Sequence, residues 1–90
     1  MKWAAVEIEH ADEVTAAQTG TALMEILSAV MREKTAPPDF EVHHVWLAPA
    51  HHVYYLSPRL ASAAEGRLGR FAVQYLAGAP NLKGARKVVL

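Results

Sequence analysis

Apolar residues recur at every second position in some segments of the 90-residue chain and at every third or fourth position in others. The order of these strand-like and helix-like segments is the feature that most constrains the fold. Residues 2–10 alternate, with Ala4, Val6 and Ile8 on one side, which is typical of a half-buried strand. Between residues 12 and 34 apolar side chains recur at intervals of three and four, which predicts an amphipathic helix. The stripe of this helix consists of Ala16, Gly20, Leu23, Leu27 and Val30.

The start of this first helix has two alternatives. Thr15 and Gln18 fit a capping box, which would place the start close to residue 15. The Thr19-Gly20-Thr21 segment could instead form a loop and delay the start. Residues 21–32 are helical under either alternative.

Two consecutive prolines separate the helix from the next unit. Pro37 and Pro38 lack the amide hydrogen and restrict the residue before them, so the chain must turn there. Two runs of β-branched and aromatic residues follow, on either side of Ala48-Pro49-Ala50. They predict a hairpin with strands near residues 41–47 and 51–56.

A second helix is predicted after the hairpin. Ser57 is suited to the N-cap and Pro58 to the first helical position. An apolar helical stripe then runs from Leu60 to Leu76 and stops at Gly78 and Pro80, although Gly66 and Gly69 within it permit a kink or a break. Residues 85–90 predict a short final strand.

The order strand, helix, strand, strand, helix, strand resembles the ferredoxin-like arrangement. This resemblance implies an α+β sandwich in which two helices cover one face of a four-stranded antiparallel sheet. Ninety residues are enough for one domain, so residues 1–90 are expected to form a single domain. No family motif accompanies the pattern, and this fold hosts many unrelated functions.

Composition excludes several classes of function. The chain has no cysteine, which removes disulfides and thiolate chemistry and favours a reducing, cytoplasmic setting. Glu7 interrupts the first apolar run, so we expect no membrane partner. The net charge of zero makes nucleic acid an unexpected partner. Charge is nevertheless uneven: residues 1–33 hold six acidic and two basic residues, and residues 57–90 hold six basic and one acidic residue.

Two histidine doublets, at residues 43–44 and 51–52, are the most unusual local feature. Neighbouring residues in a strand point to opposite faces, so each doublet offers one imidazole to each face. A two-residue hairpin loop would keep same-face histidines roughly 13 Å apart along the strands. A three-residue loop would make His44 and His52 diagonal neighbours, roughly 7–8 Å apart between α-carbons. Only the second register suits a shared ligand.

The predicted topology also brings His10 toward His51 and His52, with Glu7 or Glu9 nearby. A site of three ligands is conceivable, but the spacing matches no established zinc pattern. We therefore expect polar histidines without a specific metal site, and we assign no catalytic residue and no cofactor.

Aromatic residues on the predicted strands point to a contact surface. Trp3, Trp46, Tyr54 and Tyr55 cannot all be buried by helices on one side of a single sheet. Those on the open face would form an apolar patch, which favours a homodimer or another partner. No feature identifies a small-molecule ligand.

An anion site is the third possibility. Ser57 and Arg59 lie at the predicted start of the second helix, where backbone amides can hold an anion. The alternative, which we favour, is that the basic residues form a solvated surface that balances the acidic first half.

The leading hypothesis from the sequence is a non-enzymatic binding or regulatory module that self-associates or docks a partner through its open sheet face. The alternative is a small histidine-dependent enzyme or a metal-binding protein.

Overall fold

The computed structural model describes all 90 residues and begins with strand β1 (Ala4–Glu9) and helix α1 (Glu13–Glu33). The side chain of Asp12 caps α1, because its carboxylate accepts the amide of Thr15 at 2.8 Å and the hydroxyl of Thr15 at 2.9 Å. The alternatives of a Thr15–Gln18 capping box and of a delayed start are therefore wrong. The stripe predicted for the helix is its buried face.

Strands β2 (Val42–Ala48) and β3 (His51–Leu56) form the predicted hairpin. Ala48 pairs with His51, but the next pair along the ladder is Trp46 with His52, so Leu47 is an extra residue in a β-bulge. The short turn and the bulge together make His44 and His52 diagonal neighbours. This is the register that was expected from a three-residue loop.

The prediction that the second helix extends to Leu76 is wrong. Helix α2 spans only Pro58–Ala63, and residues 72–75 form strand β4 (Ala72–Tyr75) beside β1. Gly66, with φ +89°, turns the chain out of the helix in a conformation that other residues rarely adopt. The backbone after it supplies hydrogen-bond partners for the edge of β1, which a helix could not do.

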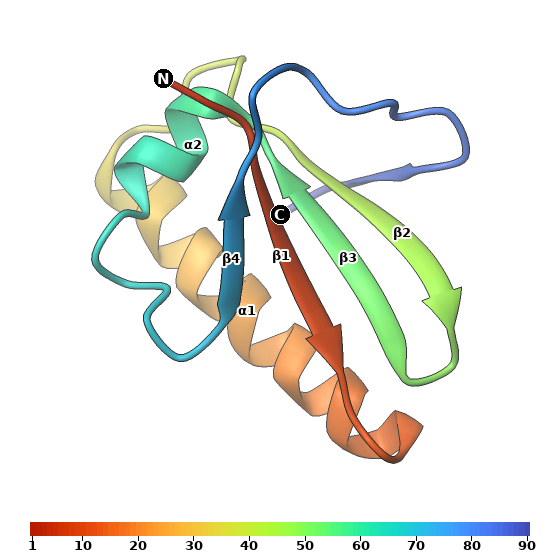
Figure 1. The fold of residues 1–90 in the computed structure, drawn as a ribbon. Coiled ribbons are helices and arrows are strands. Elements are labelled where there is room, and N and C mark those ends of the chain that lie inside the picture. Colours follow the sequence, from red (N-terminus) through yellow and green to blue (C-terminus); the bar gives the residue numbers. More distant parts are fainter.

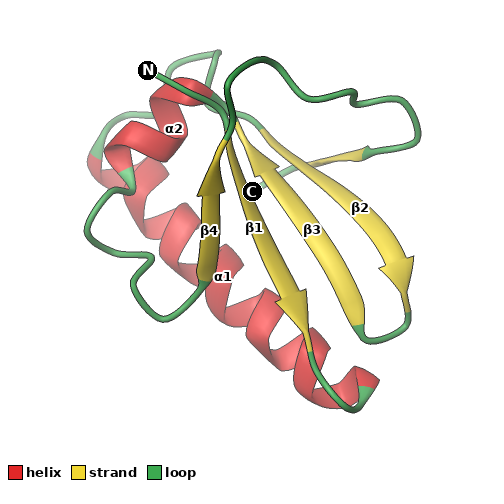
Figure 2. Ribbon diagram, viewed as in Figure 1, coloured by secondary structure: helices red, strands yellow, loops and turns green.

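The sheet therefore has five strands where four were expected. The final strand, β5 (Arg86–Val88), pairs with β2, and the order across the sheet is β4-β1-β3-β2-β5 with all neighbours antiparallel (Figure 1). In the view of Figure 2, α1 passes behind β4 and β1, and α2 lies beside the upper end of β4. No helix has the length and apolar character needed to cross a lipid bilayer.

One cluster of 13 buried hydrophobic residues lies between the sheet and the helices. Helix α1 contributes Leu23 and Leu27 and packs mainly over β1 and β3. Strand β2 is buried where it begins, at Val42, and becomes exposed toward its end. The uncovered end of β2 leaves a space beside α1.

Candidate functional site

The sheet has a helix-side face and an open face, and the register decides which aromatic residues share each. Val6 is buried against the helices, and it pairs with Tyr54, which pairs with His44. Trp46 and His52 form the next directly opposed pair on that face. These four residues, His44, Trp46, His52 and Tyr54, are called the ring cluster below.

The rings of this cluster pack closely. The imidazole of His44 stacks on Tyr54 with ring centroids 4.5 Å apart and planes 9° apart. Trp46 and His52 have centroids 5.4 Å apart. The indole of Trp46 is nevertheless 66% exposed, whereas His52 is 8% exposed. The cluster therefore has a buried base and an exposed aromatic edge.

A chain of hydrogen bonds fixes the two histidines. His52 Nε2 lies 3.3 Å from the carbonyl oxygen of Pro49, which can only accept, so Nε2 carries the proton. In neutral His52 the other nitrogen, Nδ1, must then accept, and it lies 2.8 Å from His44 Nε2, which donates. Burial lowers the pKa of His44, and the positive charges of Arg86 and of His52, when its ring is protonated, lower it further. The neutral form of His44 is the one that this arrangement favours.

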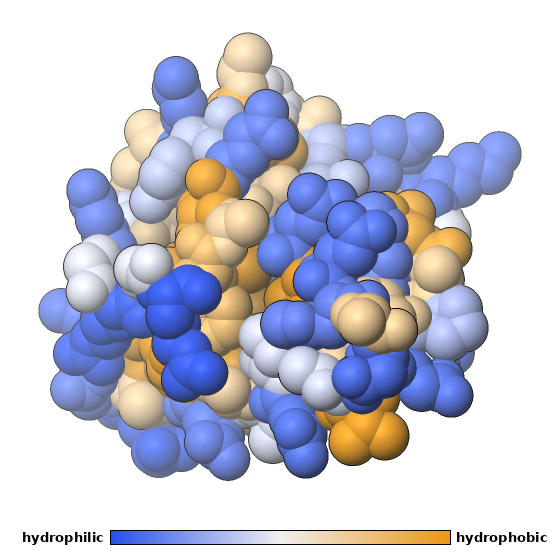
Figure 3. Space-filling model, turned by 60° about the horizontal axis from the view of Figure 1, so that its bottom comes forward, coloured by the Kyte–Doolittle hydropathy of each residue, from blue (hydrophilic) through white to orange (hydrophobic).

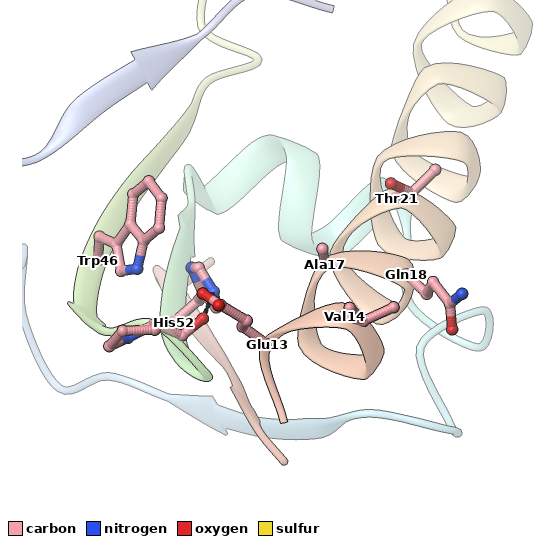
Figure 4. Close-up of a pocket in the computed structure, with 8 residues that line it drawn as sticks. Glu13, Val14, Ala17, Gln18, Thr21, Trp46 and His52 are labelled. Atoms are coloured by element: carbon pink, nitrogen blue, oxygen red, sulfur yellow. Dashed lines mark hydrogen bonds between the residues drawn. The ribbon is translucent and has the colours of Figure 1, made fainter. Parts of the chain in front are cut away.

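A cleft of about 640 Å³ separates the ring cluster from the first half of α1. Trp46 and His52 lie on one side of it, and Val14 and Ala17 of α1 lie on the other (Figure 4). The remaining lining residues are Glu13, Gln18, Thr21 and Pro49. Hydrophobic surface appears between hydrophilic side chains in Figure 3, where the lower end of the molecule is turned toward the viewer.

Tyr54 holds the sheet close to α1. A Cβ atom on Gly20 would lie 2.9 Å from the hydroxyl oxygen of Tyr54, so only glycine leaves room for this ring. Burial raises the pKa of Tyr54. Tyr54 is thus part of the packing, and Trp46 is the member of the ring cluster that remains accessible.

The residues of the conceivable three-ligand site are separated by the sheet. His51 Nε2 lies 2.5 Å from Glu7 Oε2 on the open face, and Glu9 approaches the same ring to 3.6 Å. His52 belongs to the helix-side face, and His10 bonds to the hydroxyl of Thr19 at 2.9 Å. No group of three or more histidine, aspartate or glutamate residues could hold a metal ion.

Trp3 and Tyr55 lie on the open face. Trp3 packs near His43, with ring centroids 6.1 Å apart, and His43 also contacts Glu41 at 2.9 Å. Tyr55 lines a second hollow of about 680 Å³, between the open face and residues 76–81. Both aromatic residues are half-buried.

The two residues considered for anion binding are already paired. The hydroxyl of Ser57 donates to the carbonyl of Asp39 at 2.6 Å and accepts from the amide of Glu41 at 2.8 Å. Arg59 lies 3.4 Å from the carboxylate of Asp39. Ser57 therefore ties the segment before β2 to the start of α2.

Sequence reasoning missed the α1 wall of the cleft. Val14 is 64% exposed and lies outside the buried stripe of the helix. An apolar residue outside that stripe is the sequence signal that could have indicated a second apolar surface on α1. His44 belonged to a recognised doublet, but its place in the ring cluster depends on the bulge at Leu47.

Comparison with known proteins identifies no relative: no family model matches the chain, and neither a curated protein nor a solved structure is significantly similar to it.

Proposed function

We propose that this protein is a non-enzymatic binding module that holds a planar, largely apolar group in the cleft between α1 and the β2–β3 hairpin. The observation that carries the proposal is the exposed indole of Trp46, supported from behind by the nearly buried ring of His52. Ligand sites are typically concave and mostly apolar, with a few fixed polar groups. Glu13, Gln18 and Thr21 supply such groups on the α1 side.

The hydrogen bonds of the histidines favour binding over catalysis. His52 uses both ring nitrogens within the protein, and one nitrogen of His44 donates to His52. These contacts hold the rings in fixed positions against which a ligand can stack. Preorganised rings lose little conformational entropy when a ligand binds.

An NMR titration of amide shifts tests this proposal. Indole serves as the planar apolar probe, and cyclohexanol serves as a non-planar comparison. Indole is expected to shift amides in residues 13–21 and 46–52, with a smaller response to cyclohexanol. Trp46→Ala should weaken indole binding about tenfold, because the ligand loses an aromatic surface to bury.

Trp3→Ala is the matched control, since it removes the other tryptophan from the open face and should leave indole binding unchanged. Ala17→Trp should fill the cleft and block the probe. Shifts that centre on Ala5, Val53 and Tyr55 would move the site to the open face, and the absence of saturable shifts would refute a site for planar groups.

The open face remains a second candidate surface for self-association or a partner. The hollow beside residues 76–81 supports it, because Ala5, Val53 and Tyr55 line it without a covering helix. Val53→Lys would place a charge in this hollow, so it should weaken any association through the open face.

The His-dependent enzyme or metal-binding protein is the remaining alternative. Its support is the pairing of His44 with His52 beside a cleft. A metal-binding protein would gain thermal stability when the metal is added, and a binding module for planar groups would not.

We also propose that residues 1–90 form one domain and that its fold is a ferredoxin-like arrangement extended by β5. The order β4-β1-β3-β2 and the single buried cluster support both proposals. Limited proteolysis that released a stable fragment would contradict the single domain.

A further inference from the structure

The two edges of the sheet differ in chemistry. At one edge, β5 carries Arg86 and Lys87, and charged residues protect an edge strand from pairing with another chain. At the other edge, β4 has the sequence Ala-Val-Gln-Tyr and no charge. No further strand lies beyond β4 in the sheet order.

Two residues of β4 direct their backbone groups away from the sheet. The amide of Leu76 donates to the carbonyl of Trp3 at 2.9 Å, which fixes the alternation of the antiparallel ladder. Gln74 and Ala72 therefore bond to β1, whereas Val73 and Tyr75 point their N–H and C=O groups outward. None of the turn, loop or cap hydrogen bonds uses these outward groups.

The side chains at this edge are also incompletely covered. Tyr75 is 49% exposed, and it lies on the helix-side face together with Val73. A hollow of about 300 Å³ adjoins them, lined in part by Leu68 and Phe71. An aromatic ring beside a free strand edge is suited to packing across a strand pair.

We infer that β4 pairs with β4 of a second copy in antiparallel orientation, which joins two five-stranded sheets into one sheet of ten strands. A twofold axis through Gln74 would place Val73 opposite Tyr75 of the second copy, and Tyr75 opposite its Val73. The outward groups of these residues then meet in two hydrogen-bonded pairs. Four backbone hydrogen bonds form, and no outward group of the two residues stays unpaired.

Self-complementarity is the reason to favour a second copy over a different partner. A twofold interface must match itself, and the register about Gln74 does so without a gap. The two Gln74 side chains face each other on the open face and can exchange amide hydrogen bonds. The cleft beside Trp46 lies toward the opposite edge of the sheet, so dimerisation leaves it free.

Charge-swap variants at Gln74 test this inference by sedimentation. The strand is short and the contact area small, so concentrations up to the order of 100 µM are appropriate. Wild-type protein should dimerise. Gln74→Lys and Gln74→Glu should each raise the dissociation constant at least about tenfold, because like charges meet at the twofold axis. An equimolar mixture of the two variants should dimerise again.

Val89→Lys is the matched control: Val89 is 92% exposed near the opposite edge, so the added charge should not change dimerisation. Circular dichroism should show that every variant is folded. A wild-type monomer throughout this concentration range, or dimers of Gln74→Lys as tight as wild type, would overturn the inference. Dissociation by Val53→Lys with no effect of Gln74→Lys would overturn it in favour of the open face.

Hydrogen exchange gives an independent measurement. The amides of Val73 and Tyr75 should become protected as protein concentration rises, whereas that of Gln74, which already bonds to β1, should change little. Rapid exchange at Val73 and Tyr75 in a demonstrated dimer would refute strand pairing.

Discussion

At the scale of single residues, Leu47 decides which side chains of β2 face the cleft. Because Leu47 has no partner on β3, the residues before it are shifted by one position relative to a regular ladder. His44 and Trp46 consequently share the helix-side face with His52 and Tyr54. A regular ladder from the same turn would direct Val45 and Leu47 there instead.

Gly20 provides the first prediction at this scale. In an exposed helix, Gly→Ala usually stabilises by about 1 kcal/mol, because alanine has the higher helix propensity. Gly20→Ala should instead destabilise the protein, since the new Cβ would lie 2.9 Å from the Tyr54 hydroxyl. In a Tyr54→Phe background the hydroxyl is gone, and the same change should be neutral or stabilising. Urea denaturation of the four proteins measures the coupling, and additive effects would refute the close contact.

His44 provides a pH prediction. Its pKa is lowered from 6.5 in the folded protein, so below that value the unfolded chain binds a proton more readily than the folded chain does. The stabilisation is fully present above pH 6.5 and is lost as pH falls toward the lower folded pKa. The melting temperature should therefore decrease between pH 7 and pH 5. His44→Gln should reduce this slope, and an unchanged slope would assign it to other groups.

At the scale of elements, the sequence predicted β1, the body of α1 and the hairpin, because long periodic segments carry strong signals. It failed for residues 64–76. Phe71, Ala72 and Tyr75 fit a helical stripe, but residues 71–73 are also a short apolar run that a strand can accommodate. The local pattern therefore could not decide between a helix and a strand. Pairing with β1, a long-range interaction, decides for the strand.

The cleft was less predictable than the fold. The hairpin side of the cleft depends on the bulge at Leu47, for which the sequence has no recognisable signal. The helix side depends on which face of α1 lies next to the end of β2. The Trp46 and His52 side chains were recognised as candidates, but their common face could not be assigned without the register. Strand pattern alone also could not reveal that residues 76–81 adjoin the open face.

Gly66 and Gly69 form a matched pair for a prediction about the end of α2. Gly66 has φ +89°, so Gly66→Ala should destabilise the protein by about 1 kcal/mol through backbone strain. Gly69 has no such φ and has open space around the position of a Cβ atom, so Gly69→Ala should be neutral or slightly stabilising. Thermal melts of both variants measure the difference, and equal effects would mean that Gly66 does not enforce the turn.

At the scale of the whole molecule, the acidic first half and the basic second half meet in specific pairs. Arg67 forms two hydrogen bonds to Glu33 at the end of α1, and these bonds lower the pKa of the Glu33 carboxyl. Lys87 of β5 lies 3.9 Å from Glu41. These two ion pairs join segments that are distant along the chain. Because the paired groups are largely exposed, each pair stabilises the fold only a little.

The distribution of histidines over both faces of the sheet leads to the last prediction. Glu7 and Glu9 surround His51 on the open face, whereas His44 and His52 bond to each other on the helix side. A zinc site needs at least three protein ligands that converge on one point, and neither face supplies them. Adding zinc should therefore leave the melting temperature unchanged.

A real site would behave differently, because a metal that binds only the folded state at a hundredfold excess over its dissociation constant stabilises by roughly 2.7 kcal/mol. Differential scanning fluorimetry with and without zinc distinguishes these outcomes. A saturable rise that disappears in His51→Ala would place a site on the open face with Glu7 and Glu9. A rise that disappears in His44→Gln would mean that the hydrogen bond between His44 and His52 opens to chelate the metal, and it would favour the metal-binding alternative over the binding of planar groups.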